Sequence, residues 1–159
     1  MSKRYIAPLA MALSMGVSAC SQASAPQAET SATATVQKEL PMKIEAAEDA
    51  RLAAVLIYAD WCGSCKKLEP KINAAKARND FAGTSFITLD YTDRDQEAVF
   101  RAADAAGVGA PIRAFFAEEM KTGLLLLVDL DDQTIVGDLR KELSDAEIEA
   151  AIVKASAAA

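Results

Sequence analysis

The fold of this chain is decided by one stretch, residues 55–66, which reads VLIYADWCGSCK. Its first part, residues 55–59, is a short and fully apolar run of the kind that forms a buried central strand. A helix directly after this strand would place Cys62 at its N-terminus, where unpaired backbone N–H groups favour negative charge. A thiol in that place ionises below its usual pKa of about 8.5, which makes Cys62 a candidate nucleophile at neutral pH.

Cys65 completes a pair with Cys62. Two intervening residues leave Cys65 inside the first helical turn, with its sulfur beside that of Cys62. A second thiol in this position can resolve a mixed disulfide by intramolecular attack. The spacing therefore predicts thiol–disulfide chemistry, in which Cys62 attacks and Cys65 resolves.

The segment Trp61-Cys62-Gly63-Ser64-Cys65-Lys66, followed by Pro70, resembles the active site of the thioredoxin superfamily. In that family a proline falls five residues after the second cysteine and a tryptophan flanks the reactive pair, as Trp61 does here. Gly63 and Ser64 lie between the two cysteines, and Ser64 replaces the proline that the family frequently carries there. The resemblance covers residues 41–155. It implies an α/β fold with a central mixed sheet flanked by helices, a protein-disulfide oxidoreductase activity and no cofactor.

The rest of the sequence supplies the other elements of such a fold, since apolar periodicity predicts helices and short apolar runs predict strands. In order, we expect a helix over 42–53 with Ile44, Ala47 and Leu52 on one face, a strand over 55–59, a helix over 62–78, a strand over 85–91, helices over 95–106 and 111–120, strands over 124–128 and 134–139, and a helix over 145–155 with a capping box of Ser144 and Glu147. The two consecutive helices over 95–106 and 111–120 leave an extra helical segment before the final hairpin.

Thioredoxin-like proteins carry a cis-proline loop that faces the cysteine pair, directly before the first strand of the final hairpin. Pro111 follows a Gly-Val-Gly-Ala sequence that resembles this loop, whereas Thr122 lies directly before the strand expected over 124–128. Alignment on the hairpin favours Thr122, and Pro111 is then a helix-start proline. A cis peptide bond costs far more before threonine than before proline, so we expect the substrate groove to be altered.

The buried acid that many thioredoxins carry six residues before the first cysteine is also missing. Leu56 occupies that position here. The proton of Cys65 would then pass to another group, and water and Asp60 are the two candidates.

The N-terminus predicts export. Lys3 and Arg4 precede an apolar stretch over 6–19, which has the pattern of a signal peptide and is shorter than the roughly 20 residues of a membrane-spanning helix. The sequence Val17-Ser18-Ala19-Cys20 resembles the lipobox of bacterial lipoproteins, which implies a lipid on Cys20; an ordinary cleaved signal is the alternative. Ser21, rather than aspartate, resembles the lipoproteins sorted to the outer membrane.

We therefore expect three parts: a lipoprotein signal peptide over 1–19, a lipidated Cys20 with a flexible tether over 20–40, and a thioredoxin-like domain over 41–159. Residues 21–39 are rich in Ala, Ser, Gln and Thr without apolar periodicity, which is typical of a tether. The domain would face the periplasm of a bacterial cell envelope and contact the membrane through the lipid on Cys20.

Composition excludes some functions. The net charge is −6, and removal of Lys3 and Arg4 with the signal leaves 15 basic and 23 acidic residues, or −8, so a nucleic-acid partner is not expected. Zinc is disfavoured because the chain has no histidine and only two cysteines besides Cys20. The leading hypothesis is a reductant of protein disulfides, and the resemblance implies a membrane thiol-transfer protein as its electron donor. A Cu(I) chaperone, which would use the two soft thiolates, and a non-catalytic docking module are the alternatives.

Overall fold

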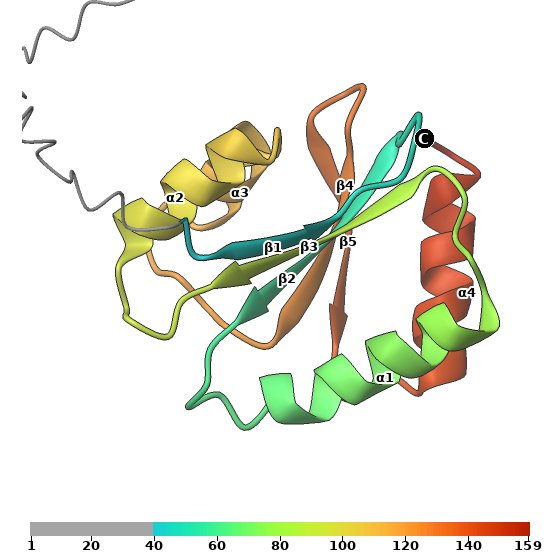
Figure 1. Cartoon of the computed structure of the whole chain (residues 1–159), viewed down its shortest axis with the longest axis horizontal. Coiled ribbons are helices and arrows are strands. Elements are labelled where there is room, and N and C mark those ends of the chain that lie inside the picture. The colour runs from blue at the N-terminus through green and yellow to red at the C-terminus, as the bar shows by residue number, and fades with distance from the viewer. Residues whose placement is uncertain (1–39) are drawn as a thin grey trace, which may run out of the picture. The chain divides into compact units, whose positions relative to one another are not determined.

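A computed structural model describes residues 40–159 (Figure 1). The predicted signal peptide, Cys20 and nearly all of the predicted tether fall on residues 1–39 and lie outside the described residues. Within residues 40–159, no helix has the length and apolar character needed to cross a membrane.

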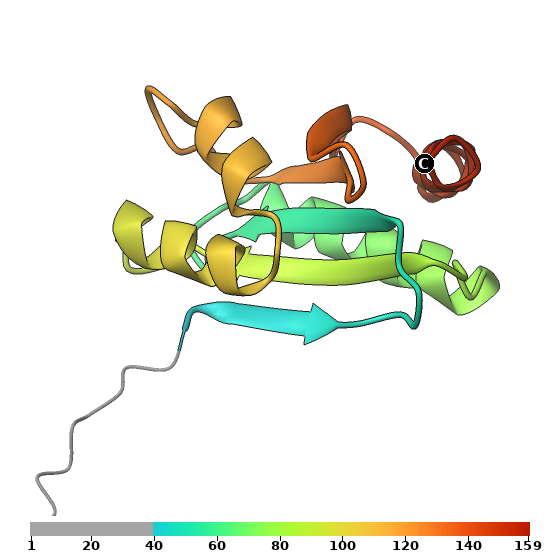
Figure 2. The same cartoon turned by 90° about the horizontal axis from the view of Figure 1, so that it is seen from above.

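Five strands form one mixed sheet in the order β1-β3-β2-β4-β5. The strands are β1 (Met42–Glu45), β2 (Leu52–Tyr58), β3 (Thr84–Asp90), β4 (Leu124–Asp129) and β5 (Thr134–Arg140). β2 and β3 run parallel, and the other three pairs are antiparallel. Figure 2 shows β1 at one edge of the sheet and the β4–β5 hairpin toward the other.

The helices cover both faces of this sheet. Helices α1 (Cys65–Arg78) and α4 (Asp145–Ser156) lie on one face, and α2 (Gln96–Ala105) and α3 (Gly109–Phe115) lie on the other (Figure 1). Side chains of a strand alternate between the two faces. In β2, Leu56 therefore packs with α1 and α4, while Val55 and Ile57 pack with α2 and α3. Because both faces are covered, the central strand is apolar along almost its whole length.

The expected fold class is confirmed. The sheet is mixed and flanked by helices, and α3 is the extra helical segment before the hairpin. The capping box also forms, since Ser144 Oγ accepts a hydrogen bond from Glu147 N–H and Glu147 Oε2 accepts one from Ser144 N–H at 2.8 Å. The C-terminal helix thus begins where the sequence predicts.

The helix predicted over 42–53 is wrong. Residues 42–45 form β1, a turn follows, and Leu52 begins β2. β1 pairs antiparallel with β3, from Met42 opposite Leu89 to Glu45 opposite Phe86. Met42 also packs against the core formed with α2 and α3. Pairing with a strand more than forty residues away in the sequence outweighs the local helical spacing.

The helix predicted over 111–120 is shorter and begins earlier. α3 begins at Gly109 and ends at Phe115. Residues 116–123 return the chain to the sheet, where Gly123 N–H donates a hydrogen bond to Ile57 O at 2.8 Å. A helix continued to Met120 would leave only three residues to reach the start of β4.

Candidate active site

Cys62 and Cys65 form a disulfide with their Cα atoms 5.3 Å apart. The pair follows the C-terminal end of β2 and lies at the start of α1. The helix begins at Cys65 with Ser64 as N-cap, so the expectation that it begins at Cys62 is three residues too early. The helical turn nevertheless reaches back, because Lys66 N–H donates to Cys62 O at 3.3 Å.

The sulfur of Cys62 is aligned with the N-terminus of this helix. Cys62 Sγ accepts a hydrogen bond from Cys65 N–H at 3.1 Å. After reduction, this backbone donor and the positive end of the helix dipole would stabilise a thiolate on Cys62. The sequence predicts a backbone N–H group that favours negative charge on the attacking sulfur, and Cys65 N–H is such a group.

The two cysteines differ in exposure. Cys62 keeps 7 % of its surface exposed, whereas Cys65 is fully enclosed. Cys65 Sγ lies 3.6 Å from Ile57 O, which would accept a hydrogen bond from the reduced thiol. An attacking thiol must reach its substrate and a resolving thiol need not, so this order of burial suits the predicted roles of the pair.

The loop before β4 packs directly against the disulfide. Gly123 has a φ of +79°, and a Cβ at this residue would lie 2.6 Å from Ser64 Cβ and 3.3 Å from Cys62 Sγ. Thr122 therefore lies in the loop that faces the pair, and Pro111 lies inside α3. Sequence reasoning missed Gly123; a glycine directly before an apolar strand was the signal that could have revealed a close backbone approach.

The loop between β3 and α2 holds Trp61. The indole Nε1–H donates to Thr92 O at 3.0 Å, and the ring makes an edge-to-face contact with Tyr91 at a centroid distance of 6.3 Å. The Arg94 guanidinium lies 4.4 Å from the centroid of the indole. Trp61 remains 46 % exposed beside the pair. Sequence reasoning missed Tyr91, Thr92 and Arg94, because only the tertiary structure brings this loop to the cysteines.

Within residues 40–159, no buried carboxylate lies beside Cys65. Leu56 is a core residue, as its apolar character predicts, and a buried acid, Asp129, lies opposite Leu52 at the far end of β2. Tyr58 packs against the buried cluster of Ala59, Cys62 and Cys65, and its hydroxyl donates to Asp60 Oδ1 at 3.2 Å. This hydrogen bond raises the pKa of Tyr58 above its ordinary value of 10.0.

A hollow of about 550 Å³ lies next to the pair. Ser64, Thr122 and Gly123 line one side of it, and residues 140–143 line the other. Lys71 fixes that second wall, because its ammonium donates to Lys141 O at 2.6 Å and to Leu143 O at 2.5 Å.

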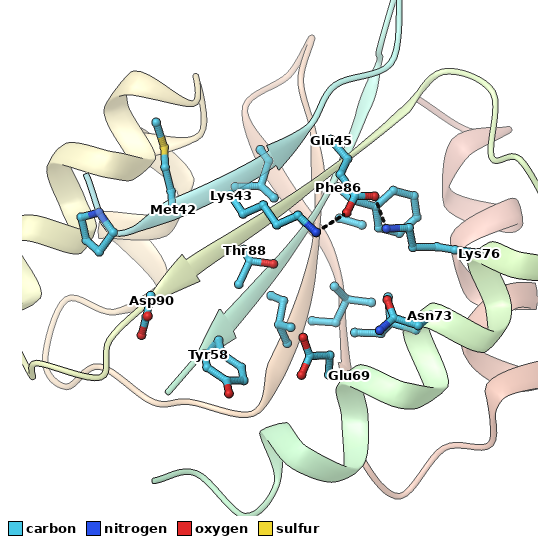
Figure 3. A pocket seen from close by; sticks show the side chains of 16 residues that line it. Met42, Lys43, Glu45, Tyr58, Glu69, Asn73, Lys76, Phe86, Thr88 and Asp90 are labelled. Atoms are coloured by element: carbon cyan, nitrogen blue, oxygen red, sulfur yellow. Dashed lines mark hydrogen bonds and ion pairs between the residues drawn. The ribbon is translucent and has the colours of Figure 1, made fainter. Parts of the chain in front are cut away.

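A second groove, of about 430 Å³, lies between α1 and the strands β1 and β3 (Figure 3). Glu45 accepts hydrogen bonds from both Lys76 and Lys43, which lowers the pKa of Glu45 and raises that of Lys43. Figure 3 shows these three side chains at one end of the groove and Tyr58 at the other. It shares no lining residue with the hollow beside Ser64, so the two are separate.

The described residues do not assemble a multidentate metal centre. Across residues 40–159, no three or more Cys, His, Asp or Glu side chains gather within reach of one ion. Any soft metal at the pair would have the two sulfurs of Cys62 and Cys65 as its cysteine ligands in this part of the chain.

Residues 31–106 match the Thioredoxin family, and this range contains β1 to α2 with the cysteine pair. The chain has a thioredoxin-like fold. The match ends before α3, so the hairpin and α4 of this thioredoxin-like protein are assigned from the sheet topology. A thioredoxin domain with a disulfide-bonded Cys-X-X-Cys pair supports a thiol–disulfide oxidoreductase role.

Two solved structures are similar to the thioredoxin-like protein. One is Trxlp from Edwardsiella tarda EIB202, with 20% identity and a TM-score of 0.43 over 67% of this chain and 84% of that chain. The other is the oxidised thioredoxin from Plasmodium falciparum, with 17% identity and a TM-score of 0.40 over 67% of this chain and 83% of that chain. No curated protein matches the sequence.

Proposed function

We propose that this thioredoxin-like protein is an exported, lipid-anchored oxidoreductase that reduces protein disulfides through Cys62 and Cys65. One observation carries the proposal: the pair is disulfide-bonded at the start of α1, with Cys62 as the more exposed cysteine and its sulfur aligned with a helix N–H group. Pairs in such a place exchange disulfides readily, because one thiol is activated and the other is close enough to resolve.

The reaction starts from the reduced pair. The Cys62 thiolate attacks one sulfur of a substrate disulfide, that S–S bond breaks, and the departing sulfur takes up a proton. Cys65 then loses its proton and attacks Cys62 Sγ, which breaks the mixed disulfide and releases the second substrate thiol. Two electrons pass to the substrate, and the Cys62–Cys65 disulfide remains. Water or Asp60 would accept the proton of Cys65.

The anchor and the partners follow from the sequence. A lipid on Cys20 would hold the domain at the periplasmic side of the envelope, on the outer rather than the inner membrane. Because that compartment is oxidising, the pair has to be reduced again after each turnover. A membrane thiol-transfer protein would supply the electrons, and a protein disulfide would be the substrate.

Insulin reduction tests the redox function. Full-length protein with dithiothreitol as the reductant should precipitate the insulin B chain faster than dithiothreitol alone, and Cys62→Ser should abolish the gain. Cys65→Ser should instead accumulate a mixed disulfide with insulin, visible on a non-reducing gel. Unchanged turnover in Cys62→Ser would refute the proposal. A folded wild-type protein without any turnover would favour the docking module.

Two measurements test the finer claims. Equilibration of the pair with glutathione buffers gives its midpoint potential, and a value more oxidising than the periplasm would make the protein an oxidant instead. Labelling of cells with radioactive palmitate tests the anchor, since Cys20→Ser should lose both the label and membrane association. Retention of both by Cys20→Ser would refute lipidation at this residue.

A further inference from the structure

Thr92 joins two loops that meet at the disulfide. Its hydroxyl accepts a hydrogen bond from Asp60 N–H at 3.0 Å and donates one to Asp90 Oδ1. Its backbone N–H donates to the same Asp90 oxygen at 2.8 Å, and its carbonyl accepts the Trp61 indole N–H at 3.0 Å. Three polar groups of one residue, in four hydrogen bonds, thus link the end of β3 to the loop that precedes Cys62.

We propose that Thr92 is a positioning residue: its hydroxyl fixes the turn that carries Asp60 and Trp61 and thereby sets the reactivity of Cys62. This inference rests on the proposed redox function. It assigns to Thr92 no contact with substrate and no share in proton transfer.

The turn explains how a bond at Asp60 reaches the sulfur. Cys62 N–H donates to Ala59 O at 3.0 Å, so Asp60 and Trp61 are the two central residues of a four-residue turn. Ala59 is fully buried at the end of β2 and fixes one end of the turn. The bond from Asp60 N–H to Thr92 fixes its centre. Because Cys62 is the last residue of this turn, the orientation of the turn sets the position of the Cys62 backbone.

Asp90 makes Thr92 a rigid support. The carboxylate lies at the end of β3 and receives both the hydroxyl and the N–H of Thr92, and hydrogen bonds to a charged acceptor are stronger than neutral ones. On either side, Asp90 N–H donates to Pro41 O and Tyr91 N–H donates to Tyr58 O, each at 2.8 Å. The base of the loop is therefore a continuation of the sheet.

The same loop covers the indole. Tyr91 contacts one edge of Trp61, and Arg94 stacks on its face. Arg94 has a φ of +59°, and its N–H donates to Tyr91 O at 3.0 Å, which curls the loop toward the ring. Release of the Asp60 bond would loosen the turn beneath Trp61, so the indole reports the effect directly.

The test compares Thr92→Val, Thr92→Ser and Thr88→Val in the full-length protein. Valine removes the hydroxyl and keeps the β-branched shape, whereas serine keeps the hydroxyl. Thr88 is the matched control, because it is a half-buried threonine of β3 that lies outside both the turn and the Thr92 network. Thr92→Ala replaces Thr92→Val if the circular dichroism spectrum of the valine variant is not that of the wild type.

We expect Thr92→Val to lower kcat/KM for insulin reduction about tenfold, the factor that corresponds to the loss of one well-placed hydrogen bond. Its midpoint potential should shift as well. Acrylamide quenching should rise, and the emission comes from Trp61 alone because the chain contains one tryptophan. Thr92→Ser should restore all three values, and Thr88→Val should leave them unchanged.

Two outcomes would overturn the inference. One is a Thr92→Val protein with the quenching and the potential of the wild type. The other is a Thr92→Ser protein whose kcat/KM, midpoint potential and quenching change as much as those of Thr92→Val. If the wild type itself fails to reduce insulin, the proposed function fails, while quenching and potential still decide whether Thr92 positions the turn.

Discussion

Gly123 lies so close to Cys62 that a Cβ on the glycine would stand 3.3 Å from Cys62 Sγ. The loop before β4 therefore touches the sulfur with its backbone, and it does so at a residue whose φ of +79° suits glycine. This relationship makes residue 123 part of the wall of the disulfide site, and it leads to the first prediction.

Gly123→Ala should destabilise the oxidised protein by about 2–4 kcal/mol, because positive φ strains alanine and the new methyl group collides with Ser64. Urea unfolding measures this loss. Gly107→Ala separates the two causes, since Gly107 has a φ of +75° and open space around it, and Gly63→Ala has neither problem. Equal losses in Gly123→Ala and Gly107→Ala would show that the contact with Ser64 costs nothing.

In the reduced protein, iodoacetamide at neutral pH should modify Cys62 at least about tenfold faster than Cys65. Cys62 has both the exposed surface and the aligned N–H donor, and the thiolate is the reacting species. Peptide mapping by mass spectrometry after timed quenching gives the two rates. Faster labelling of Cys65 would reverse the roles assigned to the two sulfurs.

Lys71→Met should lower the free energy of unfolding by about 1–3 kcal/mol, because it leaves the carbonyls of Lys141 and Leu143 without their charged donor. It should also raise hydrogen exchange over residues 140–143, the wall of the hollow beside Ser64. Lys67→Met is the control, since Lys67 is exposed on the same helix. An equal change in both variants would remove the special role of Lys71.

The capping box makes stability depend on pH. Hydrogen bonds from Ser144 N–H and Oγ–H hold the pKa of Glu147 below its ordinary value of 4.5. A carboxyl group with a lowered folded-state pKa stabilises the fold above its unfolded-state pKa and loses this contribution as the pH falls through the folded-state pKa. The stability difference between wild type and Ser144→Ala should therefore be largest at neutral pH and shrink below pH 4.5. A difference that stays constant in acid would refute the linkage.

Local sequence predicts those elements whose apolar pattern, and whose residues that begin or end a helix or strand, agree with the final packing. The apolar run at β2, the cysteine pair at the start of α1 and the capping box of α4 are of this kind. The pattern around β1 predicts a helix instead, because a four-residue edge strand carries too little periodicity to be distinguished from helical spacing. Its pairing with β3 is information that residues 42–53 do not contain.

The amino-acid sequence alone specifies the chemistry available at the site: two sulfurs three residues apart, after a strand that must be buried. The residues that surround these sulfurs depend on how the whole domain packs. Gly123 and Thr92 come from loops that lie far along the chain. Gly123 lies beside Cys62 and Thr92 binds Asp60, because β4 and β3 are the two neighbours of β2 in the sheet. Strand order is set by pairing and burial over the whole domain, so no local pattern can specify which loops meet at the end of β2.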